Sequence, residues 1–333
     1  MKLFRSEKME YKPPFSINDN IINLLAQISE LVGQVSVLHK DSISPKLRRE
    51  NRIKTIHSSL AIEHNSLSLE QVTAVLNGKR ILGAPQEIKE VQNAYEAYEI
   101  MLSLNPLDIE DLLKAHKLMM DNLVKENGVF RSGGVGVFEG EKLIHAAPPA
   151  KFVPQLIADL FEWYTKSELH ILIKSCIFHY EFEFIHPFAD GNGRMGRMWH
   201  TLLLSQWNEL FAWLPIEELI RERQQEYYDA LAAADKKADC SEFVEMMLKI
   251  IYDALAELNQ TDQVSDHVTD QVKLLLECMG RDELSATQIM ERLELSHRPT
   301  FRQNYLHPAL DMGLIEMTIP DKPKSRNQKY RRK

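Results

Sequence analysis

Cysteine is scarce in this sequence, with only three among 333 residues. Cys176, Cys240 and Cys278 lie far apart and show none of the spacings of a zinc site or a disulfide framework. Neither a structural metal site nor an oxidising compartment is therefore indicated. Cys176 and Cys278 lie among aliphatic residues, and we expect them to be reduced core residues, as is typical of the cytosol.

Long apolar runs are also missing. The sequence contains no stretch of about eighteen apolar residues, the length from which a membrane helix is considered. Residues 1–14 lack the apolar core of a secretion signal. With 44% hydrophobic and 26% charged residues, the composition is that of a soluble globular protein. We therefore expect a cytoplasmic protein that does not contact a membrane.

An excess of positive charge is the third absence. The chain has 40 Lys and Arg against 48 Asp and Glu, a net charge of −8, so the whole chain is not a general nucleic-acid binder. The charge is unevenly distributed. Residues 268–333 contain 12 Lys and Arg against 9 Asp and Glu, a net +3, which leaves −11 for the rest.

Apolar residues recur every three to four positions through most of residues 21–258, which predicts a mainly α-helical fold. Pro45 and Pro85 are suited to the first position of a helix, and Ser68 with Gln71 forms a capping box. Further helices are expected over residues 21–35, 107–124, 149–164, 170–185, 216–233 and 241–258. The helix over 170–185 is apolar on all sides and is expected at the centre of the core, with the side chains of Tyr180, Phe182 and Phe184 buried.

A stretch of different composition interrupts the helices. Val135 and Val137 alternate with glycines, Glu139 and Gly140 can form a tight turn, and a second apolar stretch follows. This pattern predicts a β-hairpin.

The C-terminal part has an organisation of its own. Residues 259–267 are polar and are interpreted as a linker, and three helices are predicted over 268–279, 286–295 and 299–312. A strand and a basic loop follow, which together indicate a winged helix. Seven basic residues among the last twelve favour DNA, whereas winged helices also serve as protein-docking or dimerisation units. The candidate base readers are Arg298, Arg302, Gln303 and Asn304.

The stretch HPFADGNGRMGR, residues 186–197, carries the most specific chemistry. The amides around Asn192, flanked by Gly191 and Gly193, can point together at the start of a helix and bind phosphate oxygens. Arg194 and Arg197 lie three residues apart, on one side of that helix, and can hold further phosphate oxygens. The alternative is a solvated turn, which would require all these residues to coincide by chance.

Two other residues of this stretch complete a reaction site. Asp190 is a hard oxygen ligand suited to Mg²⁺. His186, held by Pro187, can accept a proton from an attacking hydroxyl group. No lysine follows the glycines and no strand precedes them, so the stretch is neither a P-loop nor a dinucleotide fingerprint.

The stretch resembles the signature of the Fic family, HxFx(D/E)GNGRxxR, at every specified position. The resemblance extends from about residue 45 to 258. Fic proteins are mostly adenylyltransferases, which move AMP from ATP to a protein hydroxyl group and release pyrophosphate. The resemblance implies ATP as the substrate and Mg²⁺ as the metal. It implies as partner a target protein with an exposed Ser, Thr or Tyr hydroxyl, the chain itself included.

The resemblance also implies residue roles. His186 is expected as the general base and Asp190 as the Mg²⁺ ligand. Nucleotide binding is expected from Gly191, Asn192, Gly193, Arg194 and Arg197. The hairpin corresponds to a flap that pairs with extended target backbone. Its expected docking residues are Val135, Gly136, Val137 and His145.

A second resemblance concerns the segment HSSLAIEHN, residues 57–65. Many Fic proteins carry an inhibitory motif, (S/T)xxxE(G/N), and Ser59 to Glu63 match its first five positions. The resemblance implies that Glu63 pairs with Arg197 where the γ-phosphate would bind. The sequence departs from the motif at His64, although Asn65 follows. The alternative is a solvated acid at a helix end.

The sequence thus predicts a Fic-fold helical bundle with a hairpin flap and a C-terminal winged-helix-like domain, of the type with an N-terminal inhibitory helix. We expect an N-terminal helical region over 1–95, a catalytic core over 96–258, a linker over 259–267 and the winged-helix-like domain over 268–333. The expected activity is protein adenylylation inhibited by Glu63. Alternatives are a nucleotide-sensing DNA-binding regulator, an enzyme that also removes AMP, and transfer from another nucleotide. Both a monomer and a homo-oligomer fit the sequence.

Overall fold

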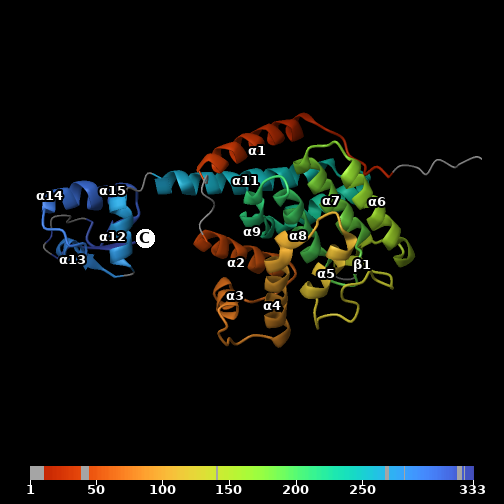
Figure 1. The fold of residues 1–333 in the computed structure, drawn as a ribbon, viewed down its shortest axis with the longest axis horizontal. Coiled ribbons are helices and arrows are strands. Elements are labelled where there is room, and N and C mark those ends of the chain that lie inside the picture. The colour runs from red at the N-terminus through yellow and green to blue at the C-terminus, as the bar shows by residue number, and fades with distance from the viewer. Residues whose placement is uncertain are drawn as a thin grey trace, which may run out of the picture. The chain divides into compact units, whose positions relative to one another are not determined.

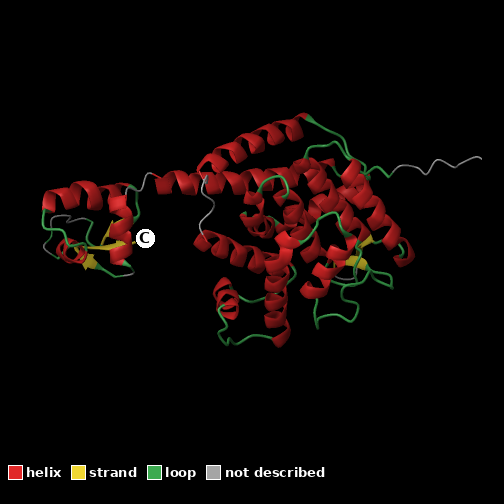
Figure 2. Cartoon of the chain, in the orientation of Figure 1, coloured by secondary structure: helices red, strands yellow, loops and turns green. Residues whose placement is uncertain are grey.

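The structure is a computed structural model (Figures 1 and 2). It describes residues 11–38, 45–139, 142–266, 270–280, 282–320, 325 and 327–333. The chain divides into two compact units, Met1–Ala256 and Glu257–Lys333.

The first unit is helical apart from one hairpin. Its helices are α1 (Asp19–Leu38), α2 (Pro45–Ile62), α3 (Leu69–Leu76), α4 (Pro85–Ile100), α5 (Ile109–Met119), α6 (Val153–Lys166), α7 (Ile171–Ile185), α8 (Asn192–Ser205), α9 (Ile216–Glu222), α10 (Gln224–Lys237) and the part of α11 (Ser241–Asp266) up to Ala256. Short 3₁₀ turns lie at Met101–Ser103, Ala150–Phe152 and Glu209–Trp213. The predicted starts at Pro45 and Pro85 and the capping box of Ser68 with Gln71 are confirmed. Among the described residues, no helix is long and apolar enough to cross a membrane.

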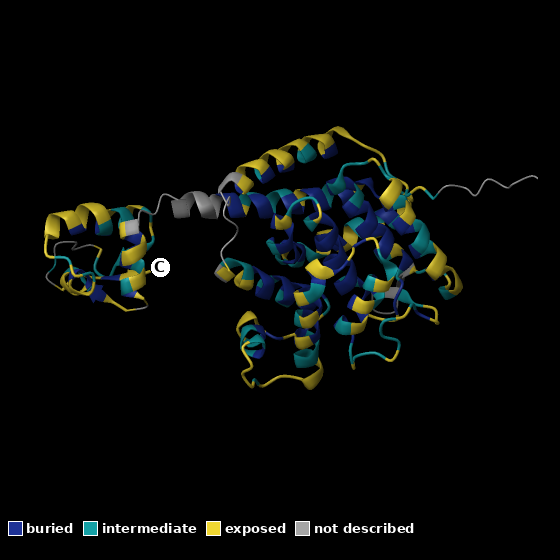
Figure 3. Ribbon diagram, viewed as in Figure 1, coloured by how far each residue is buried: buried dark blue, intermediate teal, exposed yellow. Residues whose placement is uncertain are grey.

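Helix α7 is the centre of the first unit, as its composition predicts. It packs against both α6 and α8, and its residues are buried along almost the whole length (Figure 3). Phe178 and Phe182 join the main core with Trp199 of α8. The prediction for Phe184 is wrong, because its side chain is 37% exposed.

Two helix predictions in the second half of this unit need correction. Residues 216–233 form two helices, because Arg223 leaves the helical conformation at φ −111° and ψ 34°. The guanidinium of Arg223 pairs instead with Asp253 of α11 at 2.6 Å. Helix α11 runs on to Asp266 through most of the segment predicted as a linker. Residues 267–269 lie outside the described residues.

The predicted hairpin is confirmed. Strand β1 (Gly136–Glu139) pairs antiparallel with β2 (Lys142–Ala146), with Val137 opposite His145 and an irregularity between Val137 and Phe138. Gly140 of the predicted turn lies outside the described residues.

The second unit has the order of elements of a winged helix, which confirms that prediction. The elements are α12 (Asp270–Met279), β3 (Leu284–Ser285), α13 (Ala286–Arg292), α14 (Arg298–Phe301), a π-helical turn (Arg302–Leu306), α15 (His307–Asp311), β4 (Ile315–Met317) and β5 (Lys329–Arg332). The strands form an antiparallel sheet in the order β3–β5–β4. Apolar residues of all its longer elements form a separate core, including Leu275, Ile289, Phe301 and Ile315.

The basic tail is only partly the loop that the sequence predicts. Residues 329–332 are strand β5, in which Tyr330 is buried in the core of the unit. Arg331 pairs with Glu316 at 2.5 Å and with Glu283 at 3.4 Å. Alternation of one buried aromatic residue with charged neighbours is what a half-buried strand requires. Because most residues of the tail are basic, this alternation is difficult to recognise in the sequence.

Candidate active site

The motif loop joins the end of α7 to the start of α8. His186 ends α7 in a left-handed conformation, φ 51°, and its amide still bonds to the carbonyl of Phe182 at 3.0 Å. Phe188 is buried and stacks on the ring of His116 from α5, with centroids 3.7 Å apart and planes 4° apart. The loop is therefore anchored to the core by one aromatic side chain.

Asn192 fixes the shape of this loop. Its side-chain amide donates to the carbonyl of Phe188 at 2.9 Å, and its carbonyl accepts from the Phe188 amide at 2.8 Å. The side chain of Asn192 thus stabilises the loop, while its backbone amide lies in the first turn of α8. The amides of that turn have no partner within the helix, and the helix dipole is positive there. This is the arrangement that binds anions at helix starts.

Glycine is required twice in this turn. Gly191 has φ 83°, and a Cβ there would lie 2.6 Å from Sδ of Met120. A Cβ at Gly193 would collide with the carboxylate of Glu63. The Glu63 carboxylate thus lies directly against the backbone of Gly193, so the space in front of this residue admits an anionic group.

Arg194 belongs to the same first turn of α8. It is buried, its Nη2 lies 3.2 Å from Oδ1 of Asp190, and its Nε has no hydrogen-bond partner among the described residues. A buried donor without a partner is costly unless a ligand satisfies it. Together with the open amides, this donor fits phosphate oxygens.

Arg197 is completely buried and held by helix α2. Its Nε donates to Oγ of Ser59 at 3.1 Å, and its Nη2 donates to the Ser59 carbonyl at 2.9 Å and to Oε1 of Glu63 at 2.8 Å. We call this set, Ser59 and Glu63 with Arg197, the α2 contact. The structure thus brings together residues 138 and 134 positions apart, as the second motif predicts.

Glu63 is ionised in this contact. Burial alone would raise the pKa of its carboxyl, but the charge and hydrogen bond of Arg197, with the charge of Arg194, hold that pKa below its ordinary value. A lowered carboxyl pKa means that the contact is fully present above the unfolded value of about 4.3 and is lost as the pH falls through the lower folded value. The contact is therefore insensitive to pH near neutrality.

The structure shows what the position of His64 requires of the backbone. This residue ends α2 in the left-handed conformation, φ 68°, which glycine and asparagine adopt most readily. Asn65 is buried and donates to Glu90 at 2.8 Å and to the Glu87 carbonyl at 3.1 Å, so it ties the helix end to α4. The left-handed backbone at this position is therefore the reason why the motif usually has glycine or asparagine where this chain has His64.

His186 and Asp190 lie on either side of Phe188, at the two ends of the loop. The Nδ1 of His186 is 3.3 Å from the Glu183 carbonyl, and a proton there leaves Nε2 as the basic nitrogen. The side chain of Asp190 is 56% exposed. Its Oδ1 accepts from the Gly191 amide at 2.6 Å. No group of three or more potential metal ligands occurs among the described side chains, so a magnesium ion here would need nucleotide oxygens as further ligands.

Arg131 is a site residue that the sequence did not reveal. This buried side chain donates to the carbonyls of His186 at 2.7 Å, Ile185 at 3.2 Å, Gly133 at 2.9 Å and Pro148 at 2.5 Å. Gly133 and Pro148 lie just before and after the hairpin. One guanidinium thus joins both ends of the hairpin segment to the backbone of His186.

His116 is the other residue that was missed. Its Nδ1 accepts from the Gly128 amide at 2.9 Å, so Nε2 carries the proton and donates to the Asp190 carbonyl at 3.0 Å. Burial lowers the pKa of this imidazole to about 4. His116 is therefore neutral at physiological pH and holds the loop at Asp190. Both missed residues act on backbone carbonyls, which no side-chain pattern indicates.

The flap residues are only partly described. Val135 is half-buried and Gly136 begins β1. The side chains of Val137 and His145 lie outside the described part of the chain. The role of these four residues stays a prediction.

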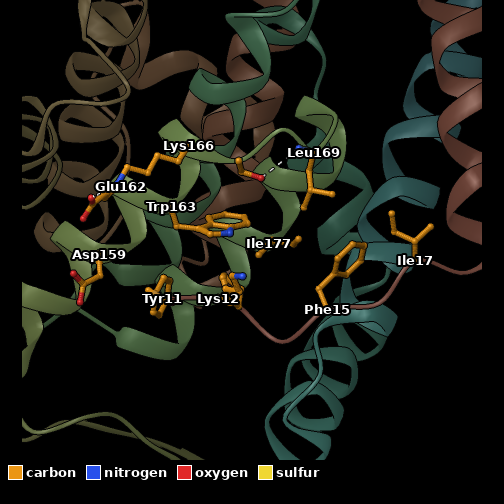
Figure 4. A pocket seen from close by; sticks show the side chains of 12 residues that line it. Tyr11, Lys12, Phe15, Ile17, Asp159, Glu162, Trp163, Lys166, Leu169 and Ile177 are labelled. Carbon is orange, nitrogen blue, oxygen red and sulfur yellow. Dashed lines mark hydrogen bonds and ion pairs between the residues drawn. The ribbon is translucent and has the colours of Figure 1, made fainter. Parts of the chain in front are cut away.

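A hollow in the first unit lies apart from the motif. It has a volume of about 640 Å³, and Figure 4 shows Trp163, Phe15 and Tyr11 around it together with charged side chains of both signs. None of residues 186–197 lines it. This hollow therefore does not mark the candidate site, which is indicated by the first-turn amides of α8 and by the Nε of Arg194, unpartnered among the described residues.

Comparison with known proteins agrees with this geometry. Residues 106–204 match the Fic/DOC family, and residues 270–332 match the C-terminal domain of Fic-like proteins, filamentation induced by cAMP. The protein adenylyltransferase fic-1 of Caenorhabditis briggsae is 26% identical over 239 residues, which cover 68% of this chain and 45% of that protein. The probable protein adenylyltransferase aq_aa38 of Aquifex aeolicus (strain VF5) is 28% identical over 270 residues, 79% of this chain and 75% of that protein. The chain thus spans less than half the length of the nematode relative.

A solved structure extends the similarity to the whole chain. The crystal structure of a Fic family protein from Desulfovibrio desulfuricans G20 is 55% identical, has a TM-score of 0.74, and the match covers 97% of this chain and 98% of that one. Because the similarity covers both the helical unit and the C-terminal unit, this chain belongs to the Fic/DOC family.

Proposed function

We propose that this protein transfers AMP from ATP to a hydroxyl group of a target protein, and that Glu63 restrains the reaction. Membership of the Fic family implies nucleotidyl transfer from ATP to proteins. The observation that carries the proposal is the position of the Glu63 carboxylate, which lies against Gly193 and on Arg197. An acid side chain occupies a place built for an anion.

Phosphate binding is assigned to the start of α8. The amides of its first turn, Arg194 and Arg197 together supply a concentration of donors that suits the β- and γ-phosphates. Charge neutralisation and positioning provide most of the rate in phosphoryl and nucleotidyl transfer. The two arginines stabilise the pyrophosphate as it leaves.

The transfer itself requires a base. The target hydroxyl oxygen forms a bond to the α-phosphorus while the bond between that phosphorus and the bridging oxygen of pyrophosphate breaks. The hydroxyl proton passes to Nε2 of His186, whose Nδ1 faces the Glu183 carbonyl. Asp190 offers an exposed carboxylate beside the phosphate site, which fits Mg²⁺. When bound, the ion neutralises phosphate charge.

Restraint follows from competition for Arg197. In the α2 contact the carboxylate of Glu63 satisfies the guanidinium that the γ-phosphate needs. ATP then binds without this arginine, and its α-phosphate is displaced from the attacking hydroxyl. Because Glu63 is one-third exposed, it can leave without unfolding of the core.

The proposal is tested by measuring AMP incorporation from labelled ATP, both into the protein itself and into added lysate. We expect Glu63→Gly to raise incorporation at least tenfold over the unsubstituted protein, because loss of the competing carboxylate frees Arg197 for phosphate. His186→Ala in the Glu63→Gly background is expected to abolish it. Glu70→Gly, at an exposed position of α3, is the control for replacing a glutamate by glycine away from Arg197. Equal incorporation by the unsubstituted protein and by Glu63→Gly would contradict the restraint.

The same assay addresses the reverse reaction. If Glu63 instead positions a water molecule for removal of AMP, purified AMP-modified protein loses its label in the presence of the unsubstituted enzyme and keeps it with Glu63→Gly. This outcome would assign Glu63 a catalytic role in addition to restraint.

DNA binding by the C-terminal unit is a second candidate function. The exposed side chains of the helical segment 298–306 include Arg298, Arg302, Gln303 and Asn304, the types that contact phosphates and base edges. Neither arginine forms an ion pair within the described residues, whereas Arg292 is paired with Asp282 at 2.8 Å. The exposed face is therefore chemically suited to duplex DNA.

Fluorescence anisotropy with a labelled duplex of mixed sequence tests this function. We expect binding that weakens steeply with salt, and a loss of about tenfold in affinity for Arg298→Ala with Arg302→Ala. Arg292→Ala, which removes an arginine already engaged by a carboxylate, serves as the matched control. Equal losses for both variants, or no binding at low salt, would exclude the function.

A further inference from the structure

A small apolar hollow lies beside the motif loop. Its volume is about 340 Å³, at the lower end of the range for ligand pockets, about 300–1,000 Å³. The apolar residues that line it include Pro148, Phe152, Leu156, Phe184 and Ile185. They come from the end of the hairpin segment, the start of α6 and the end of α7. We call this hollow the α6–α7 pocket.

Two aromatic side chains of the pocket reach the surface. Phe152 is 49% exposed and Phe184 is 37% exposed. Apolar side chains left partly in water around a hollow are typical of a binding surface. The acid in the pocket, Glu181, already accepts a hydrogen bond from the hydroxyl of Tyr11. The pocket therefore offers apolar contact and no unengaged acid for a positively charged ligand.

The pocket is fixed next to the proposed reaction site. Its residue Ile185 directly precedes His186 in the chain. The guanidinium of Arg131 also bonds to the carbonyls of two pocket residues, Pro148 at 2.5 Å and Ile185 at 3.2 Å, and to that of His186 at 2.7 Å. Pocket, hairpin end and base are therefore held together by one buried side chain.

We propose that the α6–α7 pocket receives an apolar side chain, of the size of leucine or phenylalanine, from the target segment that carries the modified hydroxyl. The inference rests on the proposed function. It adds a source of sequence preference that the hairpin cannot supply, because pairing of backbones is blind to side chains, whereas pockets for particular side chains give specificity. The occupant is an extended protein segment, since the pocket adjoins the hairpin where such a segment would pair.

A peptide series tests this assignment with Glu63→Gly as the enzyme. Each peptide is alanine-based and carries one serine, threonine or tyrosine, with one leucine or phenylalanine placed in turn at each neighbouring position. AMP transfer is followed by mass spectrometry. We expect one offset from the hydroxyl to raise kcat/KM by about tenfold or more, the gain that burial of one such side chain gives.

Two variants connect that preference to the pocket. Leu156→Trp fills the hollow and is expected to remove the preference, while ATP-dependent pyrophosphate release without peptide stays unchanged. Phe184→Ser changes an exposed wall residue and is expected to weaken the preference with little risk to folding. Leu102→Trp, at an exposed leucine outside the pocket, is the control.

The outcomes separate the two proposals. Absence of any AMP transfer or pyrophosphate release by Glu63→Gly rejects the proposed function. Transfer that is indifferent to the apolar position, or a preference that survives both Leu156→Trp and Phe184→Ser, rejects the pocket alone. If peptides are not modified but the protein modifies itself, an unchanged rate of self-modification in both variants likewise rejects it.

Discussion

In the proposed mechanism, the guanidinium of Arg197 is the group for which Glu63 and the nucleotide compete. It is completely buried, and burial would lower its pKa, but Glu63 raises that pKa further than burial lowers it. An uncompensated charge at such a depth is strongly unfavourable. The residue therefore requires a negative partner at all times. Glu63 is that partner here, and the proposed γ-phosphate would have to replace it.

His64 sets how firmly α2 ends beside this arginine. The left-handed conformation costs a residue with a Cβ about 1 kcal/mol, and replacement by glycine recovers only about half of this because glycine loses more entropy on folding. His64→Gly should therefore stabilise the protein by about 0.5 kcal/mol, and AMP transfer should not rise. Thermal and denaturant unfolding measure the change.

The matched control is a glycine with nearly the same conformation. Gly78 has φ 71°, and a Cβ at this position would have no atom within 4 Å. Gly78→Ala should therefore destabilise the protein by about 0.5 kcal/mol, because the same two effects act here with the opposite sign. If His64→Gly destabilises as well, the imidazole makes a contact that outweighs its backbone strain.

At the scale of elements, Arg131 couples the hairpin segment to the loop between α7 and α8. Lysine keeps the charge but cannot reproduce a planar fork that reaches four carbonyls. In the Glu63→Gly background, Arg131→Lys should lower kcat by about tenfold to a hundredfold, because His186 is displaced from the hydroxyl. The Kd of ATP should change little, because α8 builds the phosphate site.

Isothermal titration for ATP and a kinetic assay for AMP transfer separate these quantities. Arg223→Lys, which alters an arginine between α9 and α10 that is paired with Asp253, is the control. Equal loss of ATP affinity and of kcat would show that Arg131 merely supports the fold.

The sequence predicts the helices of the first unit well because their starts carry local signals, such as Pro45, Pro85 and the Ser68 capping box. The motif at 186–197 and its partner residues at the end of α2 can be predicted from the sequence, because their proposed roles depend on the types of their side chains. The roles of Arg131 and His116 cannot be predicted from the sequence, since these side chains contact backbone carbonyls 55 and 74 residues away. The helix break at Arg223 cannot be predicted either, because it is accompanied by an ion pair with Asp253, which is distant in the sequence.

At the scale of the whole molecule, the proposed chemistry belongs to one compact unit. All motif residues, Arg131 and the α2 contact lie in Met1–Ala256, and the C-terminal unit has a core of its own. A fragment of residues 1–266 should therefore fold and, with Glu63→Gly, transfer AMP to itself at the rate of the full chain. Circular dichroism and the incorporation assay check both statements.

Loss of duplex DNA binding by the same fragment is the companion expectation. The full-length Glu63→Gly protein, prepared in parallel, is the reference for both activities. A fragment that is folded yet inactive in AMP transfer would show that the C-terminal unit takes part in the reaction.

The α2 contact joins positions 134 residues apart in the chain, so it exists only while α2 remains seated. Glu63 follows the last residue of α2 and is one-third exposed, and a helix end opens locally at less free energy than a core such as that around α7. Mild heating, a cut between α2 and α4, or a protein that captures this helix end would thus release Arg197 while the loop between α7 and α8 is still intact. If the proposed restraint holds, limited damage to the protein would therefore raise AMP transfer before more extensive damage abolished it.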